Sequence, residues 1–220
     1  MKKIIWIAVI LCLLQTSYTF ASTSGMSGGQ GYIMESPQNK MIYFYRSQEE
    51  IDKATMDDIE RQLLLMGINP EENTFLLHGV SLRNDIGEYR TRVLSTKIVN
   101  VTGYPGNQPS GGIKFSSPQG GSFNYTPDGG PSKSVSVNFG SPYGTTSVSF
   151  TLGKRTDEVT SYSLSVPGYI YCKLWVEKKY ECKKYVVEKK VYNDVGYEWQ
   201  EWSGGVSQIL ISADLSYREV

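Results

Sequence analysis

A four-residue turn signature occurs three times between residues 117 and 144, and it restricts the fold more than any other feature of this chain. Proline at its second position suits the fixed φ of a type I turn, and glycine is favoured at its fourth. The segments around the turns (112–116, 122–125, 134–139 and 147–152) alternate polar and apolar residues. Alternation between tight turns predicts an antiparallel meander. The three copies are Ser117-Pro118-Gln119-Gly120, Thr126-Pro127-Asp128-Gly129 and Ser141-Pro142-Tyr143-Gly144.

Strand-like segments continue on both sides of this meander. We predict further short strands at 41–45, 75–80, 92–99, 160–166, 169–176, 180–187, 197–202 and 207–215. Many short strands separated by turn residues are typical of all-β folds. The sequence therefore predicts a mainly β protein with an antiparallel β-sandwich or jelly-roll-like fold.

One segment has helical periodicity instead. Ser47 followed by Glu50 forms the sequence signature of a capping box, and Gly67 supplies a stop. Apolar residues then recur on one helical face. We therefore predict one N-terminal amphipathic helix at about 48–66. Its apolar residues are Ile51, Ile59, Leu63 and Met66.

The N-terminus has the three parts of a secretory signal peptide. Lys2 and Lys3 precede an apolar run at 4–14, and small residues lead to Ala21. We predict cleavage after Ala21, a signal peptide at 1–21, and a secreted, extracellular protein. The apolar run is shorter than the roughly 20 residues that a membrane span needs. We therefore predict no transmembrane segment in the mature chain.

The remaining chain has the length of one large domain. Residues 22–31 are rich in glycine and serine and predict a flexible leader. A Gly/Pro-rich stretch at 101–112 is a candidate internal boundary, either a linker or a long loop. We favour a single β-rich domain at 32–220, because 32–100 alone offers few strands for a core.

Charge and cysteine content restrict the partners and the covalent structure. The chain carries 22 basic and 22 acidic residues, so loss of Lys2 and Lys3 leaves a small acidic excess. Phosphate binding needs a basic excess, and we therefore predict no nucleic-acid partner. Cys172 and Cys182 can form a disulfide if the chain turns near residues 177–179. If the segment is one strand, they lie roughly 30 Å apart and cannot meet.

The chain carries few residues suited to acid–base catalysis. His78 is the single histidine, and it could join Asp85 and a serine in a triad, but no nucleophile motif accompanies it. A structural strand histidine is the favoured interpretation. One histidine and two cysteines give no metal-ligand spacing, so we predict no metal and no cofactor. Glu198 and Glu201 would point to opposite faces of a strand, which favours solvent-facing side chains over a catalytic pair.

Aromatic and lysine residues near the C-terminus are the best candidates for binding. Tyr197, Trp199 and Trp202 could stack on sugar rings, although aromatic residues also fill sheet cores. Trp199 and Trp202 cannot both face the core of a regular strand, so one should be exposed or at a bulge. Lys183 and Lys184 belong to a lysine-rich segment that could form a basic strip for an anionic wall polymer, or a solvated face.

Three features resemble small secreted proteins of Gram-positive bacteria that have no assigned function. They are the short MKK leader, an acidic helix ending in Leu65-Met66-Gly67-Ile68, and the segment YIYCKLWVEKKYECKKY. The resemblance covers about a third of the chain and implies an extracellular origin without implying a mechanism.

The leading functional hypothesis is a non-catalytic extracellular domain that binds cell-surface glycan or wall polymer. Its candidate binding residues are Trp199, Trp202, Tyr197, Lys183 and Lys184. One alternative is a jelly-roll polysaccharide hydrolase or lyase. The other is a β-pore-forming protein, because the Ser/Thr/Gly-rich alternation at 132–166 resembles a membrane-inserting hairpin in composition.

Overall fold

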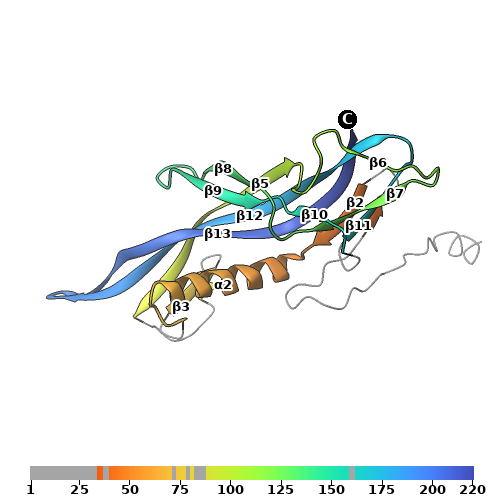
Figure 1. Cartoon of the computed structure of the whole chain (residues 1–220). Coiled ribbons are helices and arrows are strands. Elements are labelled where there is room, and N and C mark those ends of the chain that lie inside the picture. Colours follow the sequence, from red (N-terminus) through yellow and green to blue (C-terminus); the bar gives the residue numbers. More distant parts are fainter. Residues whose placement is uncertain (1–33, 37–39, 71–72, 78–79, 82–87, 159–161) are drawn as a thin grey trace, which may run out of the picture.

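The computed structural model describes residues 34–36, 40–70, 73–77, 80–81, 88–158 and 162–220 (Figure 1). The predicted signal peptide, the leader, His78 and Asp85 lie outside these residues. In the described part of the chain, strands account for 61% and helix for 12%, which confirms a mainly β fold with one helix there. The described strands form an eight-stranded sheet, a three-stranded sheet and a two-stranded sheet.

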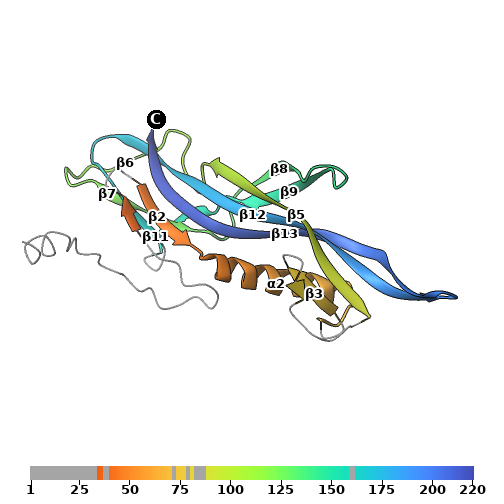
Figure 2. The same ribbon diagram turned by 180° about the vertical axis from the view of Figure 1, so that it is seen from behind.

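A long hairpin forms the centre of the large sheet. Its strands are β12 (Tyr171–Asn193) and β13 (Gly196–Glu219), of 23 and 24 residues, and they run along the molecule in Figures 1 and 2. At about 3.3 Å per residue, β12 follows a path of about 76 Å. The prediction of two separate strands within β12 and two within β13 is wrong. Residues 171–192 contain no Gly, Pro or Asn to support a turn, and Gly204 and Gly205 stay paired with β12.

The other strands of the large sheet flank this hairpin. On the β13 side lie β2 (Lys40–Tyr45) and then β1 (Met34–Ser36). On the β12 side lie β5 (Tyr89–Gly103), then β3 (Asn73–Leu77) and β4 (Val80–Ser81). The β3–β5 pair is parallel, and the other pairs are antiparallel. β6 (Ile113–Lys114) pairs with the start of β12. The 101–112 segment begins inside β5 and leads to β6, so it connects two strands that both pair with β12.

Register shifts interrupt the central ladders. β12 and β13 shift at Lys179/Tyr180 and again at Val187/Glu188, and β12 and β5 shift at Lys184/Tyr185. An unmatched residue increases the local twist of a sheet. The large sheet curls into a half-barrel, and the predicted β-sandwich or jelly roll is not confirmed.

Helix α2 (Gln48–Leu65) packs on one face of this sheet. Ser47 caps it as predicted: the Ser47 N–H donates to Glu50 Oε2 at 2.8 Å, and the Glu50 N–H donates to Ser47 Oγ at 3.3 Å. Ile59 and Leu63 pack against Tyr185 and Val187 of β12. The local capping signal and the apolar face therefore placed the helix correctly.

The two smaller sheets cover the opposite face of the large sheet. They consist of β7 (Gly121–Thr126), β10 (Lys154–Thr156) and β11 (Tyr162–Val166), and of β8 (Ser132–Asn138) and β9 (Thr145–Thr151). Phe123, Val137 and Phe150 are buried in one cluster with Leu174 and Val176 of β12. Apolar residues of β8 and β9 thus face the core while serines face outward. Core packing accounts for the alternation that suggested a pore-forming hairpin.

Candidate functional site

Helix α2 is too short to cover the face on which it lies. Its 18 residues span about 27 Å at 1.5 Å per residue, against about 76 Å for β12. Its contacts with β12 run from Lys183 to Val187. Both ends of the β12–β13 hairpin therefore extend beyond the helix. One end, residues 188–202, projects from the rest of the molecule in Figures 1 and 2, and we call it the arm.

The tip of the arm carries a pair of exposed tyrosines. Tyr192 and Tyr197 lie directly opposite each other, with ring centroids 6.2 Å apart and exposed fractions of 74% and 53%. Lys190 Nζ lies 4.2 Å from the Tyr197 centroid and 5.8 Å from that of Tyr192. Among the described strands, none pairs with the hairpin beyond the Lys189–Tyr89 position. The contacts of the two rings with each other and with Lys190 therefore join the side chains of the two strands at this end.

Trp202 occupies a register shift on the helix side of the arm. Val187 pairs with Ser203 and Glu188 pairs with Glu201, which leaves Trp202 unmatched. Its ring is 57% exposed, lies 6.5 Å from the Tyr89 ring, and has Lys189 Nζ 5.3 Å from its centroid. One of the two tryptophans was expected to be exposed or at a bulge. Trp202 is exposed, and it lies at this register shift.

Trp199 lies on the opposite side of the arm and is held by a charged cluster. The Arg90 guanidinium lies 4.6 Å from the Trp199 centroid, and its Nε donates to Glu188 at 2.5 Å. Arg92 Nη2 also donates to Glu188, at 2.8 Å. Burial alone would raise the pKa of Glu188, but the hydrogen bonds from Arg92 and Arg90 lower it below its ordinary value. The carboxylate thus stays ionised and keeps Arg90 against the ring.

The predicted lysine strip does not form, because adjacent strand residues point to opposite faces. Lys183 is 2% exposed beneath α2, where Nζ bonds Asp52 Oδ1 at 3.0 Å and Thr55 Oγ1 at 3.2 Å. Glu181 Oε1 lies 2.6 Å from the same ammonium. Lys184 faces the smaller sheets and is half-buried. This corrects the expectation that Lys183 and Lys184 share a binding surface with the arm aromatics.

Of the two alternatives left open for Cys172 and Cys182, the continuous strand is correct, and it excludes the disulfide. Cys172 and Cys182 lie ten residues apart in β12, at about 33 Å along a continuous strand, and both thiols are free and buried. Burial, aided by Glu181, raises the pKa of Cys182 to about 11. The two residues pack in the core between the large and smaller sheets. They are structural rather than cross-linking.

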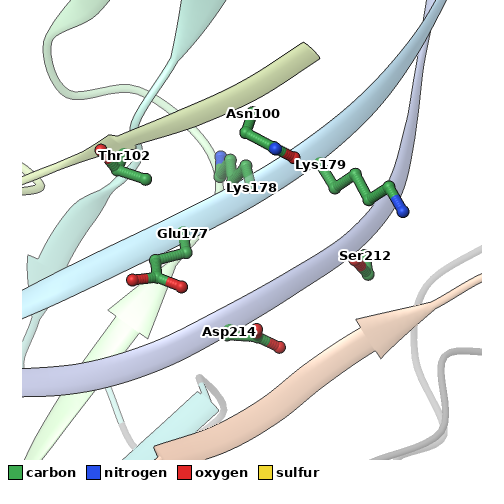
Figure 3. Close-up of a pocket in the computed structure, with 7 residues that line it drawn as sticks. All are labelled: Asn100, Thr102, Glu177, Lys178, Lys179, Ser212 and Asp214. Carbon is green, nitrogen blue, oxygen red and sulfur yellow. The ribbon is translucent and has the colours of Figure 1, made fainter. Parts of the chain in front are cut away.

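The other end of the helix-side face, which α2 does not reach, holds a shallow hollow of about 320 Å³ (Figure 3). Figure 3 shows Glu177 and Asp214 side by side on neighbouring strands, with Lys179 reaching toward β13. Lys178 points away from this face and donates to the Thr151 carbonyl at 2.8 Å. The hollow is lined by Asn100, Thr102, Glu177, Lys178, Lys179, Ser212 and Asp214. Sequence reasoning missed it, because its residues come from three strands far apart in the chain.

Other candidate chemistry finds little support in the described part of the chain. There, no three His, Cys, Asp or Glu side chains gather as they would to hold a metal ion. Glu198 and Glu201 are exposed on the arm. The described helical residues contain no segment with the length and apolar content of a membrane span. No family model, curated protein or solved structure matches the chain.

Proposed function

We propose that this is a secreted, non-catalytic protein that binds extracellular glycan through the exposed rings of the arm. The carrying observation is that Trp202 and Tyr197 are 57% and 53% exposed on a hairpin end that projects from the molecule. Sugar rings present apolar C–H faces that stack on flat aromatic rings. Lys189 and Lys190, which lie against these rings, restrict the side-chain rotamers and reduce the entropy lost on binding.

The charge of the arm favours an uncharged glycan over an anionic wall polymer. Its acidic groups balance its basic groups once the neighbouring arginines are included, and the buried Lys183 adds nothing to its surface. A balanced surface gives little long-range attraction to a polyanion. Ring stacking, rather than ion pairing, is then the main source of affinity. The groups are Arg90, Arg92, Lys189 and Lys190 against Glu188, Asp194, Glu198 and Glu201.

Co-sedimentation with isolated bacterial cell walls tests this proposal. Retention should survive high salt, because stacking is screened much less than ion pairing. Trp202→Ala and Tyr197→Ala should each weaken retention about fivefold, since a ring contact contributes about 1 kcal/mol. Tyr171→Ala is the matched control, because Tyr171 is 54% exposed and also has a lysine against its ring, Lys114 Nζ at 5.4 Å.

Two outcomes would contradict the proposal. Equal loss of retention in Tyr171→Ala would mean that any exposed tyrosine contributes and the arm has no special role. Retention that disappears at moderate salt in the parent protein would point to a charged polymer instead. Thermal unfolding of each variant separates lost binding from lost folding.

A further inference from the structure

The hollow at the far end of the helix-side face is built from two aligned rows of polar side chains. Glu177 of β12 lies opposite Thr102 of β5 and opposite Asp214 of β13. Paired residues of neighbouring strands point to the same side of a sheet, so this row presents one hydroxyl and two carboxylates together. The second row is formed in the same way by Asn100, Lys179 and Ser212. It adds an amide, an ammonium and a second hydroxyl.

These side chains remain accessible because α2 starts further along the sheet. Four of the six are half-buried in the hollow, and Asn100 and Lys179 are exposed. On the same face of β12, Lys183 is instead closed off by contacts with Asp52 and Thr55 of the helix. Along β12, the helix covers this face at Lys183, and the polar hollow begins four residues earlier, at Lys179.

Aromatic rings form the next row beyond the polar ones. Trp175 precedes Glu177 by two residues in β12 and therefore lies on the same face as Glu177. Tyr104 lies just beyond the end of β5, and its ring contacts Trp175. Their centroids are 4.9 Å apart at an interplanar angle of 82°, and Tyr104 is 44% exposed. Arg218 stacks on Trp175 at 4.7 Å. The hollow therefore has hydrogen-bonding groups across its floor, and an aromatic pair adjoins it at one side.

We propose that this hollow is a second binding site, for one or two pyranose sugar residues. A sugar hydroxyl both donates and accepts, which suits a floor that mixes an amide, hydroxyls, carboxylates and an ammonium. The exposed ring of Tyr104 offers a stacking surface for the apolar face of the sugar. The volume of about 320 Å³ falls at the lower end of the range for small-molecule sites.

This site is distinct from the arm and does not depend on the function proposed for it. Lys179 and Lys189 are ten residues apart in β12, about 33 Å along the strand. Helix α2 contacts the strand between them. Two sites at this separation on one chain would raise the avidity for a long glycan without any new contact.

Titration of the indole N–H signals by NMR tests the assignment and separates it from the arm. The signals of Trp175, Trp199 and Trp202 are assigned with one Trp→Phe variant each. Cellotetraose and chitotetraose, two soluble β-1,4-linked sugars, serve as the probes. We expect the Trp175 signal to shift with at least one probe, because Trp175 adjoins the hollow.

Isosteric substitutions then locate the contact. Thr102→Val and Asp214→Asn should each raise the Kd measured from the Trp175 shift about fivefold, as expected for loss of one hydrogen bond of about 1 kcal/mol. Thr96→Val is the matched control, because Thr96 is an exposed residue on the same face of β5, opposite Lys183. It should leave the shift unchanged.

Three other outcomes would overturn the proposal of a sugar site in the hollow. Shifts confined to Trp199 and Trp202 would remove the second site and leave the arm proposal intact. No shift in any indole with either probe would remove the second site, while retention on cell walls still decides the arm. Release of shorter sugars would replace a binding site by a hydrolytic one, with Glu177 and Asp214 as the reacting carboxyl groups.

Discussion

Lys178 provides a sharp test of the packing between the large and smaller sheets. Its side chain is 4% exposed, and Nζ donates to the Thr151 carbonyl at 2.8 Å and lies 5.9 Å from the Tyr125 centroid. Burial lowers the pKa of Lys178 from 10.5 to about 8, although Asp128 acts in the opposite direction. Replacement by methionine keeps an unbranched side chain that is one heavy atom shorter and removes the charge.

The sign of the expected effect follows from proton binding. Between pH 8 and 10.5 the unfolded chain keeps a proton that the folded protein releases, so Lys178 makes stability rise with pH across this window. At about 1.36 kcal/mol per pH unit, the full effect is on the order of 3 kcal/mol. Below pH 8, burial of the Lys178 ammonium destabilises the folded protein by this full amount. Lys178→Met removes it but also removes the donor to Thr151, which costs about 1 kcal/mol at any pH.

Guanidinium denaturation of the parent and of Lys178→Met at pH 7, 8, 9 and 9.5 measures this effect. The variant should be more stable by about 2 kcal/mol at pH 7, and its advantage should shrink steadily above pH 8. Lys179→Met, one residue along and exposed, controls for loss of a lysine from this strand. A parent-to-variant difference that is the same at pH 7 and pH 9.5 would refute the argument that burial destabilises the ammonium.

Two further substitutions and one chemical titration test other contacts in the structure. Gly205→Ala places a Cβ 2.6 Å from Tyr185 Oη, so it should lower the free energy of unfolding by about 1–3 kcal/mol; unchanged denaturation would contradict the close approach of Tyr185 to this glycine. Glu188→Gln should destabilise by about 1–3 kcal/mol at pH 7, because the lowered pKa of Glu188 contributes stability that is lost as pH falls below 4.5; an equal deficit at pH 3 would count against this. Thiol titration should find Cys172 and Cys182 unreactive in the folded protein and reactive after unfolding. If neither thiol reacts in protein that is unfolded without a reductant, the two cysteines form a disulfide and the assignment of free thiols is wrong.

The sequence by itself determined the elements whose signals are local. Ser47 and Glu50 specify the start of α2 through hydrogen bonds made within one turn, and the alternation around residues 117–150 specifies strands with one apolar face. The glycines of the three turns, Gly120, Gly129 and Gly144, all have positive φ, as their position in the signature requires. Each of these features depends on interactions between residues close together in the chain.

Only the tertiary structure decided which lysines are buried, where the long strands continue and which parts of the sheet stay open. Lys183 is buried because Asp52 and Thr55, about 130 residues away, lie over it, and Lys178 is buried because β9 covers it. A strand pattern shows that Lys178 and Lys179 face opposite ways but not which side is covered. That choice depends on pairing and packing between distant segments, and the same packing leaves both the arm and the polar hollow accessible.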